Sequence, residues 1–234
     1  MRKFFCFMLL FMVICATTAA EDLKPPIISV SGEGFVEIPP DRAIISVGVV
    51  TRDKNPAAVQ NSNAKSANSV INSIIALGIQ KKNISTGNYS FNPVYRHLNN
   101  GKSEIDGYEA TNSVTIIVDD LNLVGKIIDT ALNHGANRVD NLNFTLRNKN
   151  SSQDEALRLA ILDAKRKADV AAGVLGKNIA GIRSISINSS SISAPRNYKL
   201  ARATVEDSAS FETPIETGNL QCFANVHVEF EISR

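Results

Sequence analysis

Three segments of this sequence repeat one order: a run with helical periodicity, then a glycine, then a run typical of a β-strand. The three glycines are Gly78, Gly135 and Gly176. A glycine just beyond the last helical turn can adopt the left-handed backbone conformation that ends many helices. Each helical run has a single apolar stripe and therefore buries only one face. The pattern predicts helices that cover one face of a sheet, which is an α+β fold.

Polar residues indicate where the first two helices begin. Asn55 suits the N-cap of the first helix, and Pro56 suits its first helical position. Asp119 or Asp120 is predicted to cap the second helix. A run of asparagines is expected to make the outer face of the first helix unusually polar: Asn61, Asn63, Asn68 and Asn72.

The third helix has a different start signal. Ser152 and Glu155 have the spacing of a capping box, and the helix is expected to continue to about Leu175. Its predicted buried stripe consists of Ala156, Leu157, Ala160, Ile161, Ala164 and Ala168. Its charged residues are interpreted as a solvated face: Asp163, Lys165, Arg166, Lys167 and Asp169.

Strands are predicted where β-branched and aromatic residues alternate with polar ones. The last strand has the clearest alternation, which places Cys222 on its apolar face. A hairpin is expected around residues 99–101, and residues 191–214 lack a period and are predicted to form a long loop or arm. The expected fold is a two-layer sandwich of mixed or antiparallel sheet with helices on one face, or two interleaved lobes. The predicted strands cover residues 27–37, 42–53, 84–97, 107–118, 138–147, 179–190 and 220–232.

The beginning of the chain has the order of a secretory signal. Two basic residues precede an apolar run over residues 4–15, and small residues then lead to Ala20. Cleavage after Ala20 would make residues 1–20 a signal peptide and residues 21–234 one mature exported domain. The apolar run is shorter than the ~20 residues that a spanning helix needs. We therefore expect no transmembrane segment in the mature chain.

Removal of the signal changes the charge and the cysteine content. The whole chain has 25 Lys and Arg against 23 Asp and Glu, and the signal contains Arg2 and Lys3 but no acidic residue. The mature chain is therefore formally neutral, without the basic excess of a nucleic-acid-binding protein. Cys222 is the one cysteine that remains, so no intrachain disulfide can form.

The sequence has no group of residues with the spacing of an active site. His97, His134 and His227 have no metal-ligand partner nearby in sequence, and Cys222 is predicted to be buried and unreactive. Residues 32–34, Gly-Glu-Gly, are followed by a strand rather than a helix and are not a phosphate-binding loop. We therefore expect a protein that is not an enzyme, with no catalytic residues, no cofactor and no metal.

A series of short motifs, in their order and spacing, resembles the SIMPL-domain family of bacterial proteins, a domain of unknown function. The resemblance extends over essentially all of residues 28–234. In sequence order the main motifs are Val30-Ser31-Gly32-Glu33-Gly34, Pro40-Asp41-Arg42-Ala43, Val47-Gly48-Val49, Leu77-Gly78-Ile79, Ile84-Ser85-Thr86, Pro93-Val94-Tyr95, Gly107-Tyr108-Glu109-Ala110-Thr111-Asn112, Gly135-Ala136-Asn137 and Pro214-Ile215-Glu216.

The resemblance implies a periplasmic protein of a Gram-negative bacterium without an established enzymatic activity. It also implies a role in envelope or oxidative stress and recognition as an antigen by the host. Separately, the neutral charge and uncovered strand edges predict self-association, with the 191–214 arm lying over a neighbouring subunit. The alternative is a ligand-binding module for peptide or glycan, with a pocket lined by Tyr89, Phe91, Tyr95 and Tyr108.

Overall fold

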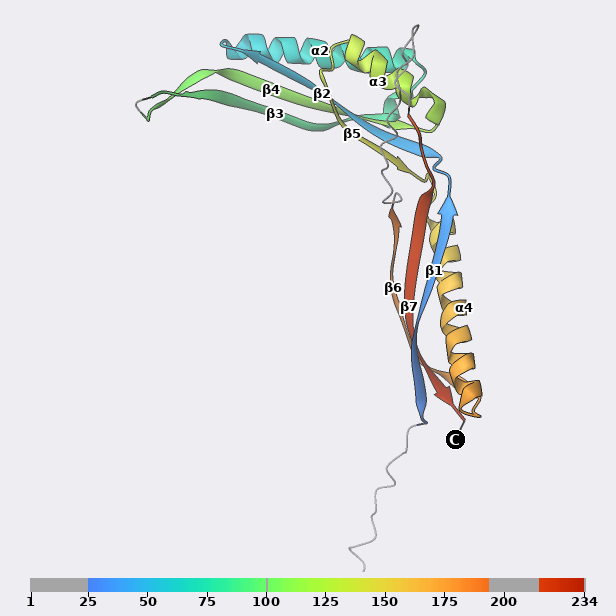
Figure 1. Ribbon diagram of the computed structural model, residues 1–234. Coiled ribbons are helices and arrows are strands. Elements are labelled where there is room, and N and C mark those ends of the chain that lie inside the picture. The colour runs from blue at the N-terminus through green and yellow to red at the C-terminus, as the bar shows by residue number, and fades with distance from the viewer. Residues whose placement is uncertain (1–24, 100, 194–214, 234) are drawn as a thin grey trace, which may run out of the picture.

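The computed structural model describes residues 25–99, 101–193 and 215–233. In this part of the chain two antiparallel sheets each carry helices on one face. Figure 1 shows the two helix-covered sheets as the arms of an L. The predicted α+β class is therefore confirmed, in the form with two lobes rather than one sandwich. The predicted signal peptide, residues 1–20, lies outside the described residues.

The first lobe is built on a four-stranded sheet, here called sheet B, in the order β3-β4-β2-β5. Helices α2 and α3 pack against this sheet. The bounds of its strands are β2 (Arg42–Asp53), β3 (Ile84–His97), β4 (Ser103–Val118) and β5 (Arg138–Thr145). The helices are α2 (Pro56–Ala76), α3 (Val124–Asn133) and the short 3₁₀ helices η1 (Lys81–Asn83) and η2 (Leu121–Leu123).

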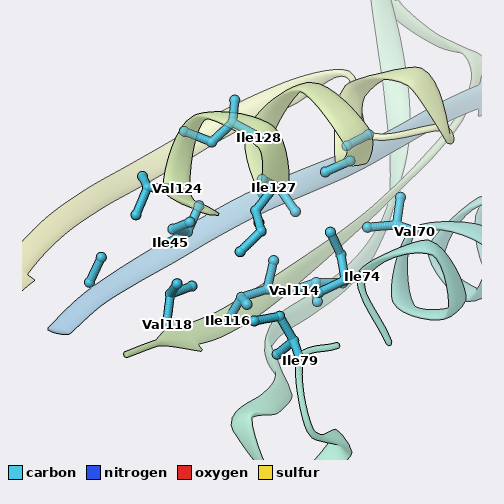
Figure 2. Close-up of a cluster of buried hydrophobic side chains, with 14 of the residues drawn as sticks. Ile45, Val70, Ile74, Ile79, Val114, Ile116, Val118, Val124, Ile127 and Ile128 are labelled. Atoms are coloured by element: carbon cyan, nitrogen blue, oxygen red, sulfur yellow. The ribbon is translucent and has the colours of Figure 1, made fainter. Parts of the chain in front are cut away.

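A core of branched side chains fills the space between sheet B and its helices (Figure 2). Ile45 of β2 and Val114 and Ile116 of β4 project from the sheet toward Ile74 of α2 and Ile127 of α3. All five are fully buried. Because burial of such a side chain stabilises a fold by about 1.5–3 kcal/mol, this core explains why the strand alternation and the helical stripes face one another.

The ends of α2 match the signals in its sequence. The Asn55 side chain accepts hydrogen bonds from the backbone N–H groups of Ala57 (2.9 Å) and Ala58 (3.4 Å), which confirms it as the N-cap. Beyond the helix, Gly78 has a φ of 94°, a left-handed conformation that is unfavourable for residues with a Cβ atom. Both helix ends could therefore be predicted from local chemistry.

Two details of this lobe differ from expectation. The prediction that Asn63 lies on the outer face of α2 is wrong: it is buried, and its Nδ2 donates to the backbone oxygens of Val49 and Ala110. Asp120 caps the 3₁₀ helix η2 by accepting from the N–H of Asn122, so the second α-helix begins only after this extra turn.

The second lobe is built on a three-stranded sheet, here called sheet A, in the order β1-β7-β6. The chain forms β1, leaves to build the whole of sheet B, and returns for the remaining elements, so the two lobes are interleaved. One long helix, α4, lies on β1 and β7. The bounds are β1 (Ile27–Ile38), α4 (Asn150–Val174), β6 (Ile179–Ser193) and β7 (Leu220–Ile232).

Close approach of two backbones holds α4 on sheet A. Ala156, Ala160 and Ala164 lie on the buried face of α4, opposite Gly32 and Gly34 of β1. A Cβ atom on Gly32 would clash with the carbonyl oxygen of Ala160, and one on Gly34 would clash with that of Ala156. The Gly-x-Gly sequence is therefore a packing feature, because only a strand without side chains at these positions admits the helix so closely.

The start and the exposed face of α4 also correct the sequence interpretation. The helix begins at Asn150, so Ser152 lies buried inside the first turn and no capping box forms. Ile161, predicted to be buried, is 38% exposed. β6 continues to Ser193, beyond the predicted start of the long arm, and residues 194–214 lie outside the described part of the chain. No helix among the described residues is long and apolar enough to span a membrane.

Candidate functional site

The histidines lie apart from one another and contact hydroxyl or carbonyl groups. His227 on β7 is within hydrogen-bond distance of the hydroxyls of Ser29 (2.9 Å) and Ser31 (3.2 Å) on the exposed face of sheet A. His134 contacts the carbonyl oxygen of Thr130 at the end of α3. Among the described residues, no group of three or more His, Cys, Asp or Glu is placed to hold a metal ion.

Cys222 lies in the core of sheet A. It is fully buried between the sheet and α4, as the alternation of its strand predicts. Burial raises the pKa of the Cys222 thiol, which disfavours the thiolate that would act as a nucleophile. The residue therefore contributes packing rather than reactivity.

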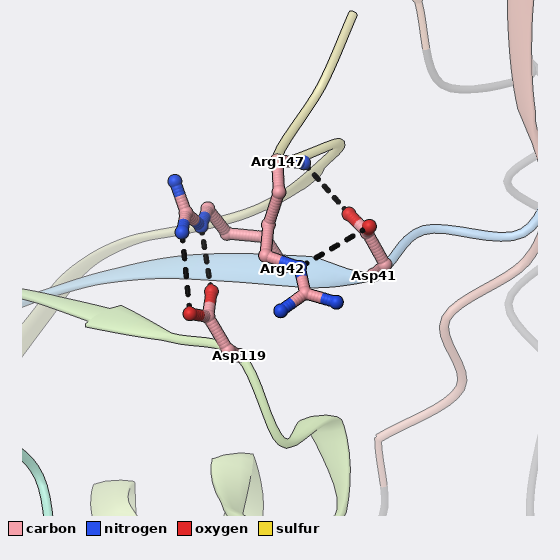
Figure 3. A network of polar contacts seen from close by, with 4 residues as sticks. All are labelled: Asp41, Arg42, Asp119 and Arg147. Atoms are coloured by element: carbon pink, nitrogen blue, oxygen red, sulfur yellow. Dashed lines mark hydrogen bonds and ion pairs between the residues drawn. The ribbon is translucent and has the colours of Figure 1, made fainter.

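A network of four charged residues lies where the two lobes join (Figure 3). Arg42 donates to both carboxylate oxygens of Asp119, at 2.7 and 3.2 Å, and this hydrogen bonding lowers the pKa of Asp119. Asp41 accepts from the backbone N–H and the Nε of Arg147, at 2.7 and 3.3 Å. A hollow of about 420 Å³ adjoins the network and is lined in part by Lys149. These pairs link the start of β2 to the end of β4 and to the segment that follows β5.

One edge of sheet A is closed by side chains from α4. Asp163 accepts from the backbone N–H of Glu33 (3.1 Å), and Lys167 donates to the backbone oxygen of Ser31 (2.9 Å). Asp163 also pairs with Lys167 (2.7 Å) and Arg166 (2.7 Å), and these hydrogen bonds, the one from Lys167 first, lower its pKa. The N–H of Glu33 and the carbonyl oxygen of Ser31, on the outer edge of β1, are thus hydrogen-bonded. The interpretation of the charged residues of this helix as a purely solvated face is therefore wrong for Asp163 and Lys167.

The opposite edge of sheet A, β6, leaves apolar side chains uncovered. Ile182, Ile185 and Ile187 lie opposite the buried β7 residues Phe230, Val228 and Val226 and so project from the helix side of the sheet. Because α4 lies over β1 and β7, the three isoleucines are 63%, 46% and 56% exposed. We call this surface the isoleucine row. In the described part of the chain β6 pairs with β7 alone, so it is also a free strand edge.

The β3–β4 hairpin carries the second uncovered surface. Tyr89 and Tyr95 are 50% and 55% exposed, and Phe91 stacks on Tyr108 with ring centroids 5.7 Å apart. Near them is a hollow of about 210 Å³, which Tyr108 lines. Its other lining residues are Arg52, Asp53, Lys54, Val94, Asp106 and Gly107. The four aromatic residues predicted to line a pocket thus lie on one hairpin. Of the four, only Tyr108 lines this hollow.

Sequence reasoning named these aromatic residues but not the charged residues beside them. Arg52 lies at the end of β2 and Lys54 directly follows this strand, whereas Asp106 lies on β4, more than fifty positions away. Antiparallel pairing of β2 with β4, which sets Asp53 opposite Tyr108, brings them together. The isoleucine row was also missed, because the sequence does not show that α4 stops short of β6.

Comparison with known proteins identifies relatives of this chain. The pattern of the SIMPL family, described as a protein of unknown function, matches residues 28–230. The 26 kDa periplasmic immunogenic protein of Brucella melitensis is 28% identical over 214 residues, which cover 89% of this chain and 86% of that protein. The uncharacterized protein YggE of Escherichia coli K12 is 24% identical over 217 residues, 93% of this chain and 87% of that protein. The chain belongs to the SIMPL family.

Proposed function

We propose that this chain is a non-catalytic periplasmic protein that acts in the cell envelope through its surfaces, and that it self-associates through β6. The periplasmic location is supported by the tripartite signal in residues 1–20 and by the relative named as a periplasmic immunogenic protein. That name also supports recognition as an antigen. A role in envelope or oxidative stress is part of the same proposal.

A non-catalytic role is supported by how the reactive groups are used. Asp163 and Lys167 bind backbone atoms of β1, and Asp41 and Asp119 bind the arginines of the joint. Cys222 is buried with a raised pKa. These groups stabilise the fold, so binding and assembly are the activities left for the surface.

The isoleucine row is the observation that carries self-association. An exposed apolar row on a free strand edge is a template for pairing with another chain. The other edge of sheet A is occupied at Ser31 and Glu33 by α4 side chains, which leaves β6 as the edge that can accept a partner. Pairing of two β6 strands about a two-fold axis would extend sheet A and place both isoleucine rows side by side.

Light scattering of the mature protein tests this proposal. The wild type should have a mass above that of one chain at micromolar concentration, and Ile185→Asp should shift the mass to that of one chain. Val174→Asp is the matched control, because Val174 is exposed at the end of α4, outside β6. A wild type that stays monomeric, or an Ile185→Asp variant that keeps the oligomer, contradicts self-association through β6.

Export has its own test. Intact mass of the protein from the periplasmic fraction should correspond to a chain that begins near Glu21 and carries no lipid. Retention of Met1 or an acyl group on Cys15 would contradict the proposed cleavage. For the stress role, deletion of the gene should increase sensitivity to peroxide, and unchanged sensitivity would remove this part of the proposal.

A second candidate function is a binding module for a peptide or a glycan. It is favoured by the exposed aromatic side chains of the β3–β4 hairpin, a type of surface that marks binding sites when it is contiguous. The two functions use different lobes and do not exclude one another.

A further inference from the structure

From Tyr89 onward the helix side of β3 is left open, because α2 packs on β2 and β4. Strand register puts the aromatic residues on this side: Tyr89 lies opposite Asn112, and Phe91 lies opposite Ala110, a residue buried under α2. Tyr108 lies two positions before Ala110 on β4, and side chains two residues apart share a face. The rings of Tyr89, Phe91 and Tyr108 therefore form one surface, here called the aromatic platform.

The platform offers flat apolar faces. The rings of Phe91 and Tyr108 are inclined by only 21°, with centroids 5.7 Å apart, so each supports the other. Tyr89 is half exposed beside them. Ring faces carry partial negative charge and suit an apolar partner with C–H groups on its surface, rather than an anion.

Unpaired hydrogen-bond acceptors lie next to the platform. The Oδ1 atoms of Asn112 and Asn63 are both buried and have no hydrogen-bond partner. The Nδ2 of Asn63 donates to the oxygens of Val49 (2.9 Å) and Ala110 (3.1 Å), which leaves its oxygen as the free group. An unsatisfied buried acceptor costs about 1–3 kcal/mol and calls for a donor from water or a ligand. Asn112, opposite Tyr89, is the one of the two that is partly exposed.

The hollow at Tyr108 supplies further polar groups. Arg52 and Lys54 carry positive charge and Asp53 and Asp106 negative charge, so its lining is neutral overall. Arg52 is also paired with Glu109 at 2.5 Å. At about 210 Å³ the hollow is below the size of pockets for drug-sized ligands, about 300–1,000 Å³, and suits a single small ring.

We propose that the platform and the hollow bind a neutral sugar chain, an inference that depends on the binding-module candidate above. A sugar ring has a C–H face for Tyr89, Phe91 and Tyr108, and its hydroxyls both donate and accept hydrogen bonds. The balanced charge of the hollow disfavours a nucleic acid or an anionic surface. A peptide would instead pair with the edge of β3, where Pro93 removes a backbone donor and two register shifts interrupt the strand.

Tyrosine fluorescence of the mature protein provides the test. The chain has no Trp and four Tyr, three of which are Tyr89, Tyr95 and Tyr108 on this hairpin. Titration with cellotetraose, maltotetraose and the tetramer of N-acetylglucosamine should give a saturable change with at least one of them. Tyr89→Ala and Phe91→Ala should weaken that affinity about tenfold, or about 1.4 kcal/mol. Asp106→Asn, which changes a polar residue of the hollow and keeps every aromatic ring, should also weaken the sugar affinity.

Matched controls separate this site from other aromatic surfaces and from self-association. Phe223→Ala removes a partly exposed ring from sheet A and should leave sugar affinity unchanged. Ile185→Asp should bind the sugar normally even if its mass changes, so the two proposals fail separately. The inference is overturned if none of the three sugars binds by fluorescence and by saturation-transfer NMR. It is equally overturned if folded Tyr89→Ala and Phe91→Ala keep full affinity, or if tetra-alanine competes with the sugar.

Discussion

The two lobes join helices to sheets by opposite means. Between sheet B and its helices, branched side chains such as Ile74, Ile116 and Ile127 fill the space. In the middle of β1 no strand side chain separates it from α4, because Gly32 and Gly34 of the strand meet alanines of the helix. In both lobes a helix packs on a sheet. In the first lobe bulky side chains fill the space between them, and in the second lobe the two backbones approach closely.

This difference predicts opposite responses to mutation. A filled core fails when volume is removed, since the surrounding atoms collapse only partly into the cavity. A close backbone contact fails when volume is added, since a strand and a helix cannot move apart locally without loss of neighbouring contacts. Substitutions that remove volume should therefore destabilise the lobe of sheet B, and substitutions that add volume should destabilise the contact between β1 and α4.

The largest effect is expected from a cavity in sheet B. Ile116→Ala removes a fully buried side chain and should lower the free energy of unfolding by about 2–5 kcal/mol, measured by chemical denaturation. Ile117→Ala is the control, because Ile117 is the next residue of β4, half-buried on the other face. Equal losses for the two variants would contradict the assignment of the core to the helix side.

Added volume on β1 tests the other lobe. Gly34→Ala places a methyl group against the backbone of Ala156 and Ala160 and should lower stability by about 1–3 kcal/mol. Gly173→Ala on α4 is the matched substitution in open space and should raise stability by up to about 1 kcal/mol, because alanine favours a helix. A Gly34→Ala variant as stable as the wild type would show that the close contact is not required.

A hydroxyl group introduced at Cys222 tests whether the core between sheet A and α4 is apolar. Cys222→Ser keeps the volume but buries a hydroxyl, and should lower the free energy of unfolding by about 1–3 kcal/mol. Sugar binding at the hairpin should not change. Rapid labelling of native Cys222 by a bulky thiol reagent would contradict its burial.

Local chemistry made much of this fold predictable. The N-cap Asn55, the left-handed Gly78 and the alternation from Leu220 to Ile232 each act within a few residues, and each is found as expected. The choice between one sandwich and two lobes depends on which strands pair, and pairing joins residues that are distant in sequence. β1 and β7, for example, pair from Ile27 with Glu231 to Ile38 with Leu220.

Non-local contacts also explain the residues that were misjudged. Asn63 looked like a surface residue by composition, but it is buried because two strand carbonyls accept its amide hydrogens. Small residues at matched spacing, Gly32 and Gly34 on a strand and Ala156, Ala160 and Ala164 on a helix, were a signal that could have predicted close packing. The charged lining of the hollow had no such signal, since its residues meet only through register.

The smallest effect is expected where α4 holds the edge of β1. The pKa of Asp163 is lowered from 3.8 by Lys167, Arg166 and the N–H of Glu33. A carboxyl group with a lowered pKa in the folded state contributes stability above its unfolded pKa and loses it as the pH falls through the folded value. The contribution of Asp163 should therefore be complete at neutral pH and decline below about pH 4.

Thermal unfolding of the wild type and Asp163→Asn measures this contribution. The wild type should be more stable at neutral pH, and the difference should shrink steadily as the pH is lowered below about 4. Asp169→Asn is the control, because Asp169 pairs with Lys165 on the same helix (2.8 Å). If the difference between wild type and Asp163→Asn were independent of pH, the carboxylate would not be what holds the helix to the edge of β1, and close packing alone would explain that contact.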